Sequence, residues 1–335
     1  MGAFTNDSFD ILSTNFSRMK AFAAIGKTIA FEHDMERVAG PKPDRQPEAL
    51  ATSMASLSSP EGRLLNGLFW FMNLTDTDAK AFHILTQDGN LLKARKIWEE
   101  GEQNMSSLQN QLMCHLLRDS RFYAKALQLA STLYANYGSE FIVTVSNGFE
   151  VVMPEELMYV LLTAIVNISN GACVGWNQAV MRMKDKDVAQ QWAEAKATWH
   201  ITKLQDALNV AKATEIHSPK DNHDIAITLM EQAEPHLKAL KELWQSHPTL
   251  LSRYTTIADA VCEVILEHEI EHSNHSKWFP TKTDQKLKLY RFCYCHAATV
   301  RLKSRCQLNI NIVLNRKDSA PLLPNGMPDN RLPKG

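Results

Sequence analysis

Apolar residues recur at intervals of three and four along most of this chain, which is the spacing of an amphipathic α-helix. The interval is kept without a proline from Trp176 to Thr214, and it returns over residues 224–244, 250–271 and 284–315. A shorter, almost wholly apolar run covers residues 157–168. The pattern predicts an all-α fold, with the long runs after residue 170 forming a helical bundle.

One stretch departs from the helical interval. Phe141 to Val145 and Phe149 to Met153 are rich in β-branched residues, and an Asn-Gly pair at residues 147–148 lies between them. Such a pair between two short runs is typical of a tight β-hairpin. The same stretch also fits an irregular connection between two helices, and the sequence leaves both interpretations open.

Prolines divide the chain into parts. A loop with three prolines covers residues 38–47, and Pro60 ends the helix that follows it. Residues 1–66 are therefore predicted to form a small three-helix unit, residues 67–170 a second helical part, and residues 171–317 the bundle. Residues 318–335 hold four prolines, so we predict a disordered, proline-rich tail.

Four short segments of the first unit match one family. They are FDIL at residues 9–12, MKAF at 19–22, AFEHD at 30–34 and LSSPEGR at 57–63. In these segments the unit resembles a J domain, the co-chaperone module that stimulates DnaK-type chaperones. The resemblance implies a chaperone dock at His33 and Asp34. The family's His-Pro-Asp triplet is incomplete, because no proline stands between these two residues, so we expect a degenerate dock that does not stimulate a chaperone ATPase.

The second part resembles a pair of tetratricopeptide repeats, in which small residues let paired helices approach closely. Ala94 and Ala126 mark the two copies, 32 residues apart, close to the family's period of about 34. Since about three repeats are needed for a free-standing solenoid, these copies must pack on neighbours, and residues 155–168 would supply a capping helix. The order of parts resembles a bacterial family of J-domain-related helical proteins.

Composition gives few functional clues. Apolar residues make up 44% of the chain and the net charge is −1, which is ordinary for a globular protein. We expect an intracellular, cytoplasmic protein, because the first residues lack a secretory pattern, no run is long enough to span a membrane, and the six cysteines are scattered along helical runs.

The strongest catalytic candidate is HEIEH at residues 268–272. On a helix, His268 and His272 would face one way and could hold zinc, with the glutamate between them as general base. His275 could add a third ligand. The alternative is a solvated helix face in a stretch that is rich in both residue types. We expect no cofactor, and a zinc-dependent hydrolase is the alternative function.

Charge is distributed unevenly between two regions. Residues 185–271 contain 15 acidic against 8 basic residues, and residues 282–317 contain 9 basic against one acidic residue. Basic residues with aromatic neighbours could bind nucleic acid; the candidates are Arg291, Arg301, Lys303 and Arg305. We favour the other interpretation, in which the aromatics are core and the charges pair with the acidic region, within the chain or across a homo-oligomer.

The sequence thus predicts a non-enzymatic helical scaffold, a co-chaperone-like adaptor that binds a protein partner, as would a subunit of a bacterial stress or defence complex. Three consecutive aromatics cannot all face one core, so one of Phe69, Trp70 and Phe71 could reach a partner. The full set of predicted partner-binding residues is Phe69, Trp70, Phe71, Trp98, Tyr123, His33 and Asp34.

Overall fold

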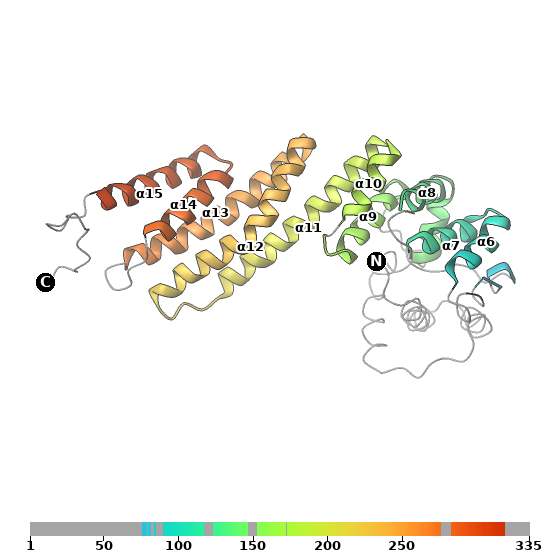
Figure 1. Ribbon diagram of the computed structural model, residues 1–335, viewed down its shortest axis with the longest axis horizontal. Coiled ribbons are helices and arrows are strands. Elements are labelled where there is room, and N and C mark those ends of the chain that lie inside the picture. Colours follow the sequence, from blue (N-terminus) through green and yellow to red (C-terminus); the bar gives the residue numbers. More distant parts are fainter. Residues whose placement is uncertain are drawn as a thin grey trace. The chain divides into compact units, whose positions relative to one another are not determined.

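The structure is a computed structural model, which describes residues 76–78, 80, 81, 84, 90–116, 123–146, 153–171, 173–275 and 283–318. The predicted J-like unit with His33 and Asp34, the aromatic segment Phe69–Phe71 and the proline-rich tail after residue 318 lie outside these residues. Within them the chain is all-α, as predicted, and its helices are labelled in Figure 1.

The chain divides into two compact units, Met1–Lys196 and Ala197–Gly335. The division falls inside one long helix, α11 (Lys186–Ala213), and not near residue 170, where the sequence places the start of the bundle. The helix α10 (Val174–Met183) belongs to the first unit, because it packs against α8 (Tyr123–Ser146).

The first unit is organised around α8. Before it come α6 (Leu91–Glu100) and α7 (Met105–Leu116), and after it come the short helix η2 (Pro154–Glu156) and α9 (Leu157–Ile168). The helix α6 packs on α7, η2 contacts α9, and α7, α9, α10 and η2 all contact α8. Ala94, Ala126 and Ala130 are completely buried, as expected for small residues where helices approach closely.

The stretch that suggested a hairpin is helical. Residues 141–145 continue α8, which ends at Ser146. Phe141 is completely buried and Ile142 nearly so, whereas Val143 is half exposed. Burial of the apolar side chains on one helix face therefore decides the conformation over the β preference of the individual residues, and the hairpin interpretation is wrong for this part.

Two of the predicted long helices are each broken into two. The run from Trp176 to Thr214 breaks at Lys184, which has a left-handed backbone with φ of 57°. Asp185 then starts α11, because its carboxylate accepts hydrogen bonds from the amides of Asp187 and Val188. The run over residues 284–315 breaks between α14 (Thr283–His296) and α15 (Val300–Asp318).

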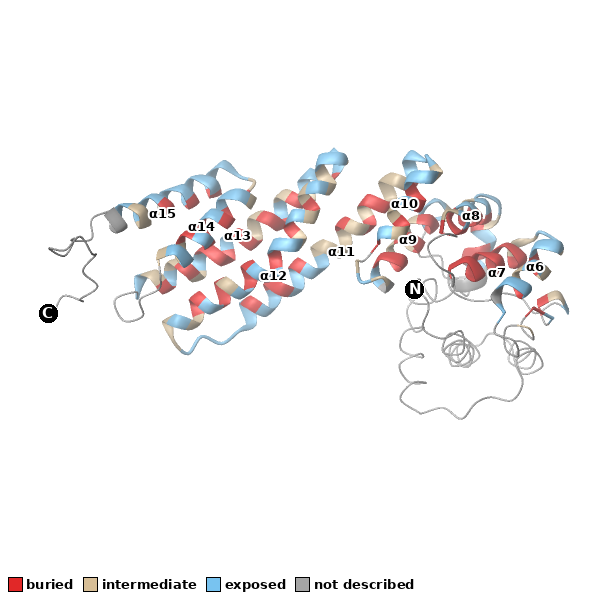
Figure 2. Cartoon of the chain, viewed as in Figure 1, coloured by how far each residue is buried: buried red, intermediate tan, exposed pale blue. Residues whose placement is uncertain are grey.

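The second unit is a bundle built on one antiparallel pair. That pair is α12 (Pro219–Ser246) and α13 (Leu251–Asn274), joined through the short helix η3 (Pro248–Leu250). The helix α14 packs on both, and α15 packs on α13 and α14. Buried residues recur along the inner side of each helix (Figure 2). In the described part of the chain, no helix combines the length and apolar character needed to cross a bilayer.

Candidate partner-binding face

The helix α15 has two different sides. Leu302, Cys306 and Ile310 follow one another at intervals of four and are buried against α13 and α14. This stripe fixes which side of the helix faces the core. The opposite side faces solvent, as the exposed colouring along α15 in Figure 2 shows.

That solvent-facing side carries both apolar and basic residues. Arg301, Arg305, Leu308 and Ile312 are spaced i, i+4, i+7 and i+11, so they share one helix face. Leu308 is 60% exposed and Ile312 is 41% exposed, and Val300 at the start of the helix is 81% exposed. We call Arg301, Arg305, Leu308 and Ile312 the outer face of α15.

Within the part of the chain that the structure describes, no acidic residue neutralises the arginines of this face. Across the described ranges, no ion pair involves any of the four basic residues that the sequence singled out, Arg291, Arg301, Lys303 and Arg305, and all four are exposed. Among the described residues, the expected pairing with the acidic region is found for Lys286, whose Nζ lies 3.9 Å from Glu269 Oε1. The expectation that these charges pair within the chain is therefore wrong for the four candidates.

The expectation that the aromatic residues among these basic residues belong to the core is confirmed for two of three. Tyr290 and Phe292 of α14 are buried in the core, whereas Tyr294 is 42% exposed. Tyr290 and Phe292 lie on different sides of α14, and both are covered because α14 packs on α12, α13 and α15. Only Tyr294 among these aromatics therefore presents a ring to solvent.

The start of α15 is held in place from α13. The carboxylate of Asp259 accepts hydrogen bonds from the backbone amide of Ala298, at 2.6 Å, and from that of Thr299, at 3.2 and 3.3 Å. These amides precede the helix and would otherwise lack partners. Asp259 thus fixes the turn between α14 and α15 and with it the direction in which the outer face points.

The HEIEH motif lies in the interface between α12 and α13. Glu269 is completely buried and accepts a 2.6 Å hydrogen bond from Nδ1 of His223, which is also buried. Nδ1 of His268 donates to the side chain of Asn222, and Nδ1 of His272 donates to the carbonyl of Pro219. The motif therefore joins the end of α13 to the start of α12.

This arrangement does not match a zinc-hydrolase site. His275 is exposed and lies 3.3 Å from Glu271, one turn back along α13. In the residues described, no three His, Cys, Asp or Glu side chains come together in a way that could hold a metal ion, and catalytic zinc usually has three protein ligands. Glu269, the glutamate that the motif would place as general base, is completely buried and bonds His223. The interpretation of the motif as a solvated face is also wrong for Glu269 and His272, because both are buried.

Two residues predicted to bind a partner are part of the core. Trp98 is 1% exposed, and its indole N–H donates to Asp78 at 2.7 Å. The ring of Tyr123 stacks on that of Trp176 with a centroid distance of 3.8 Å, and both rings are buried. A large aromatic ring stabilises a helix contact most when it is fully enclosed. Neither ring is available to a partner, which corrects the prediction for these two positions.

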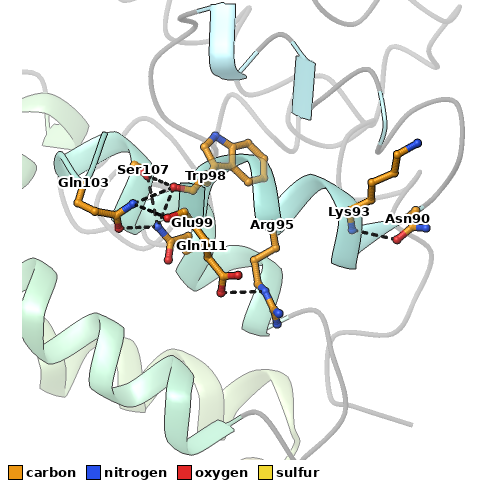
Figure 3. Close-up of polar contacts among 8 residues, drawn as sticks. All are labelled: Asn90, Lys93, Arg95, Trp98, Glu99, Gln103, Ser107 and Gln111. Atoms are coloured by element: carbon orange, nitrogen blue, oxygen red, sulfur yellow. Dashed lines mark hydrogen bonds and ion pairs between the residues drawn. The ribbon is translucent and has the colours of Figure 1, made fainter. Parts of the chain in front are cut away.

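The polar residues around Trp98 complete the end of α6. Gln103 donates to the carbonyls of Trp98 and Glu99, and Ser107 also donates to the carbonyl of Trp98 (Figure 3). Gln111 connects this group through a 2.9 Å hydrogen bond to Gln103. The last carbonyls of a helix lack partners within the helix, and these side chains supply them. The cluster is therefore structural.

Leu308, Ile312 and Asp259 are not among the residues predicted from the sequence. A signal for the first two was present, because apolar residues recur at two separate angles around residues 300–312 and only one angle can face the core. Asp259 had no such signal, since its partners lie about 40 residues further on. No family model matches the chain, and no curated protein or solved structure matches it either. The resemblance to J-domain and tetratricopeptide proteins stays a prediction.

Proposed function

We propose that this protein is a non-enzymatic helical scaffold that binds a protein partner through the outer face of α15. The observation that carries the proposal is the combination on one exposed helix face of two apolar side chains, Leu308 and Ile312, with two arginines that have no ion pair in the described residues, Arg301 and Arg305. The complementary surface is an amphipathic helix with leucine-like residues on one side and acidic residues beside them.

The physical contributions of the two residue types differ. Fully burying a leucine or isoleucine side chain contributes about 1.5–3 kcal/mol, so the apolar pair supplies most of the affinity. The arginines attract an acidic partner from a distance and set its orientation, which increases the association rate more than the affinity. Because Asp259 fixes the start of α15, the face is ordered before binding and little entropy is lost.

The other parts of the chain fit a scaffold. By this proposal the tetratricopeptide-like pair is the support of the first unit, and the completely buried Ala94, Ala126 and Ala130 favour it. The J-like residues 1–66 would serve as a degenerate chaperone dock. The protein would act in the cytoplasm as a subunit of a bacterial stress or defence complex.

Nucleic acid is the second candidate ligand. Arg291, Arg301, Lys303 and Arg305 are all exposed and without an ion pair in the described part of the chain, as residues that contact a phosphate backbone are. The apolar pair on the same face argues for protein, because a phosphate backbone offers no surface for Leu308 and Ile312. The two candidates therefore differ in their sensitivity to the apolar residues.

The test uses the full-length chain and two double variants. Arg301→Glu with Arg305→Glu reverses the charge of the face, and Leu308→Ser with Ile312→Ser removes its apolar contacts. Lys125→Glu in α8 and Met181→Ser in α10 are matched controls, because each replaces an exposed residue of the same type in the first unit. A partner that co-purifies with the wild type is then purified and titrated against every variant.

We expect each double variant to lower the affinity for the purified partner at least about tenfold. The two control variants should leave this affinity unchanged. Loss with the charge variant alone, together with salt-sensitive binding of single-stranded DNA, would replace the protein partner by nucleic acid. Unchanged partner affinity in both double variants would overturn the proposal. Circular dichroism of each variant checks that its helices are retained.

A further inference from the structure

A second site lies in the first unit, between α8, η2, α9 and the start of α11. It is a pocket of about 440 Å³, within the size range of small-molecule sites. Polar side chains line it at Tyr134, Glu155, Asp185, Asp187 and Gln191, and apolar side chains at Met158 and Val188. Three separate stretches of the chain meet there, residues 131–135, 154–158 and 185–191, so no short sequence motif identifies the pocket.

The charge of this pocket has one sign. Glu155, Asp185 and Asp187 line it, and the lining contains no lysine or arginine. No ion pair involves any of these three carboxylates within the described residues. Asp185 uses Oδ1 to cap α11 and has a second oxygen for other contacts. The three carboxylates are exposed to solvent, and their like charges around one pocket make the local potential negative, which favours a cation there.

Two buried polar groups in the pocket have no partner. Tyr134 is 6% exposed, and its hydroxyl makes no hydrogen bond to any residue that the structure describes. The side-chain oxygen Oε1 of Gln191 is also buried without a partner. Polar groups that are buried in a native protein nearly always have partners, so these two groups favour a ligand with polar atoms in this pocket. Burial raises the pKa of Tyr134, which keeps its hydroxyl protonated and able to donate or accept.

The remaining wall is apolar and closely fitted. Met158 and Val188 are buried beside the acidic residues, and they offer a surface for an alkyl chain. Gly138 lets η2 lie directly against α8, because a Cβ at this position would be 2.8 Å from Cβ of Pro154. The wall that carries Pro154 and Glu155 therefore has its place set by packing.

We propose that this pocket binds an organic cation, an ammonium or guanidinium group on an unbranched alkyl chain. The alkyl chain lies along Met158 and Val188, and the cationic group lies among Glu155, Asp185 and Asp187. Tyr134 and Gln191 complete its hydrogen bonds. Such a group has two sources, a free aliphatic polyamine or a lysine or arginine side chain of another protein.

The site is independent of the proposed binding face on α15. It lies wholly in the first unit, and its ligand has the opposite charge to the acidic partner expected at α15. Variants at one site therefore leave the other unchanged, and failure of either proposal is visible by itself.

The experiment is isothermal titration calorimetry on the full-length chain with three probes. Spermidine represents the free polyamine, a short arginine-containing peptide represents the protein side chain, and the same peptide with citrulline for arginine lacks the charge. Glu155→Gln with Asp187→Asn removes two of the three pocket charges while it keeps the Asp185 cap. Glu100→Gln with Glu102→Gln is the matched control, because these exposed acidic residues of the same unit do not line the pocket.

We expect either spermidine or the arginine peptide to bind, and the citrulline peptide not to bind. The pocket double variant weakens binding at least about tenfold, and the control double variant changes it less than about twofold. Tyr134→Phe keeps the ring and removes the hydroxyl, and it should also weaken binding of the cation. If Tyr134 had only a structural role, this variant would not change cation binding. No binding of spermidine and peptide, or equal weakening by the pocket and control variants, would overturn the proposal.

Discussion

Nδ1 of His223 donates a 2.6 Å hydrogen bond to Glu269 Oε2, and both side chains are buried between α12 and α13. Glu269 is the second residue of the HEIEH motif, which the sequence presents as a zinc-peptidase signature. Lys286 and Ser273 approach its other oxygen, at 3.9 and 3.3 Å. The glutamate therefore connects three helices through polar contacts, and the motif contributes to stability.

Glu269→Ala should strongly destabilise the second unit. The change leaves His223 and Lys286 without their shared carboxylate partner inside the protein, and removing one member of such a buried pair costs about 3 kcal/mol. Urea unfolding followed by circular dichroism measures the change in the free energy of unfolding. Glu271→Ala, at an exposed position two residues further on, is the control and should stay within about 0.5 kcal/mol. Equal stability of the two variants would contradict the structural role.

Stability should also fall in mild acid. The Nδ1 atoms of His200 and His236 lie 2.9 Å apart, so one ring donates a hydrogen bond and the other accepts it. The two rings therefore cannot be protonated at the same time. Burial, with a smaller effect of Lys203, lowers the pKa of His236 below 6.5. The unfolded chain then binds more protons than the folded one, so stability is complete above pH about 6.5 and falls as the pH drops through the folded pKa.

Thermal unfolding at pH about 7.5 and about 5.5 measures this effect. The midpoint should be lower at the acidic pH, and His236→Gln should reduce the difference between the two values. His217→Gln is the control, because His217 is exposed. A pH difference that His236→Gln leaves unchanged would assign the effect to other groups, such as His268 and His296, whose pKa values burial also lowers.

Gly138→Ala should destabilise the first unit, although alanine favours a helix by about 1 kcal/mol over glycine. The new Cβ would be 2.8 Å from Cβ of Pro154, so η2 must move away from α8, at a cost of about 1–3 kcal/mol. Chemical unfolding gives the sign directly. Ser139→Ala, at the neighbouring exposed position, should be neutral or slightly stabilising. A stabilised Gly138→Ala protein would show that η2 does not pack as described.

Asp259→Ala should loosen the turn before α15. It removes the acceptor for the amides of Ala298 and Thr299, and loss of such a cap costs about 1–2 kcal/mol. Hydrogen exchange followed by mass spectrometry should show faster exchange in the first turn of α15, with the centre of α12 unchanged. Equal exchange in wild type and variant would mean that Asp259 does not hold this turn.

The sequence predicts the helices better than it predicts their ends and contacts. Helical periodicity is a local signal, so the all-α fold and the positions of most helices follow from it. The break at Lys184 depends on one residue with a left-handed backbone, and the break before Val300 depends on Asp259 in another helix. Neither is encoded in a local apolar pattern.

The functional roles of single residues also depend on contacts that a local sequence pattern does not encode. Trp98, Tyr123 and the HEIEH residues stand out by residue type, yet their roles are set by partners distant in sequence, such as Asp78, Trp176 and His223. Burial of a conspicuous residue cannot be read from its own neighbourhood. The outer face of α15 was accessible to sequence reasoning, because Leu308 and Ile312 lie at a different helix angle from the core stripe.

Hydrogen–deuterium exchange of the full-length chain with and without its purified partner tests the central claim most directly. If the outer face of α15 binds the partner, peptides covering residues 300–315 become protected in the complex, and Leu308→Ser with Ile312→Ser abolishes the protection. A stable complex that protects other helices and leaves residues 300–315 exchanging as in the free protein would contradict the account.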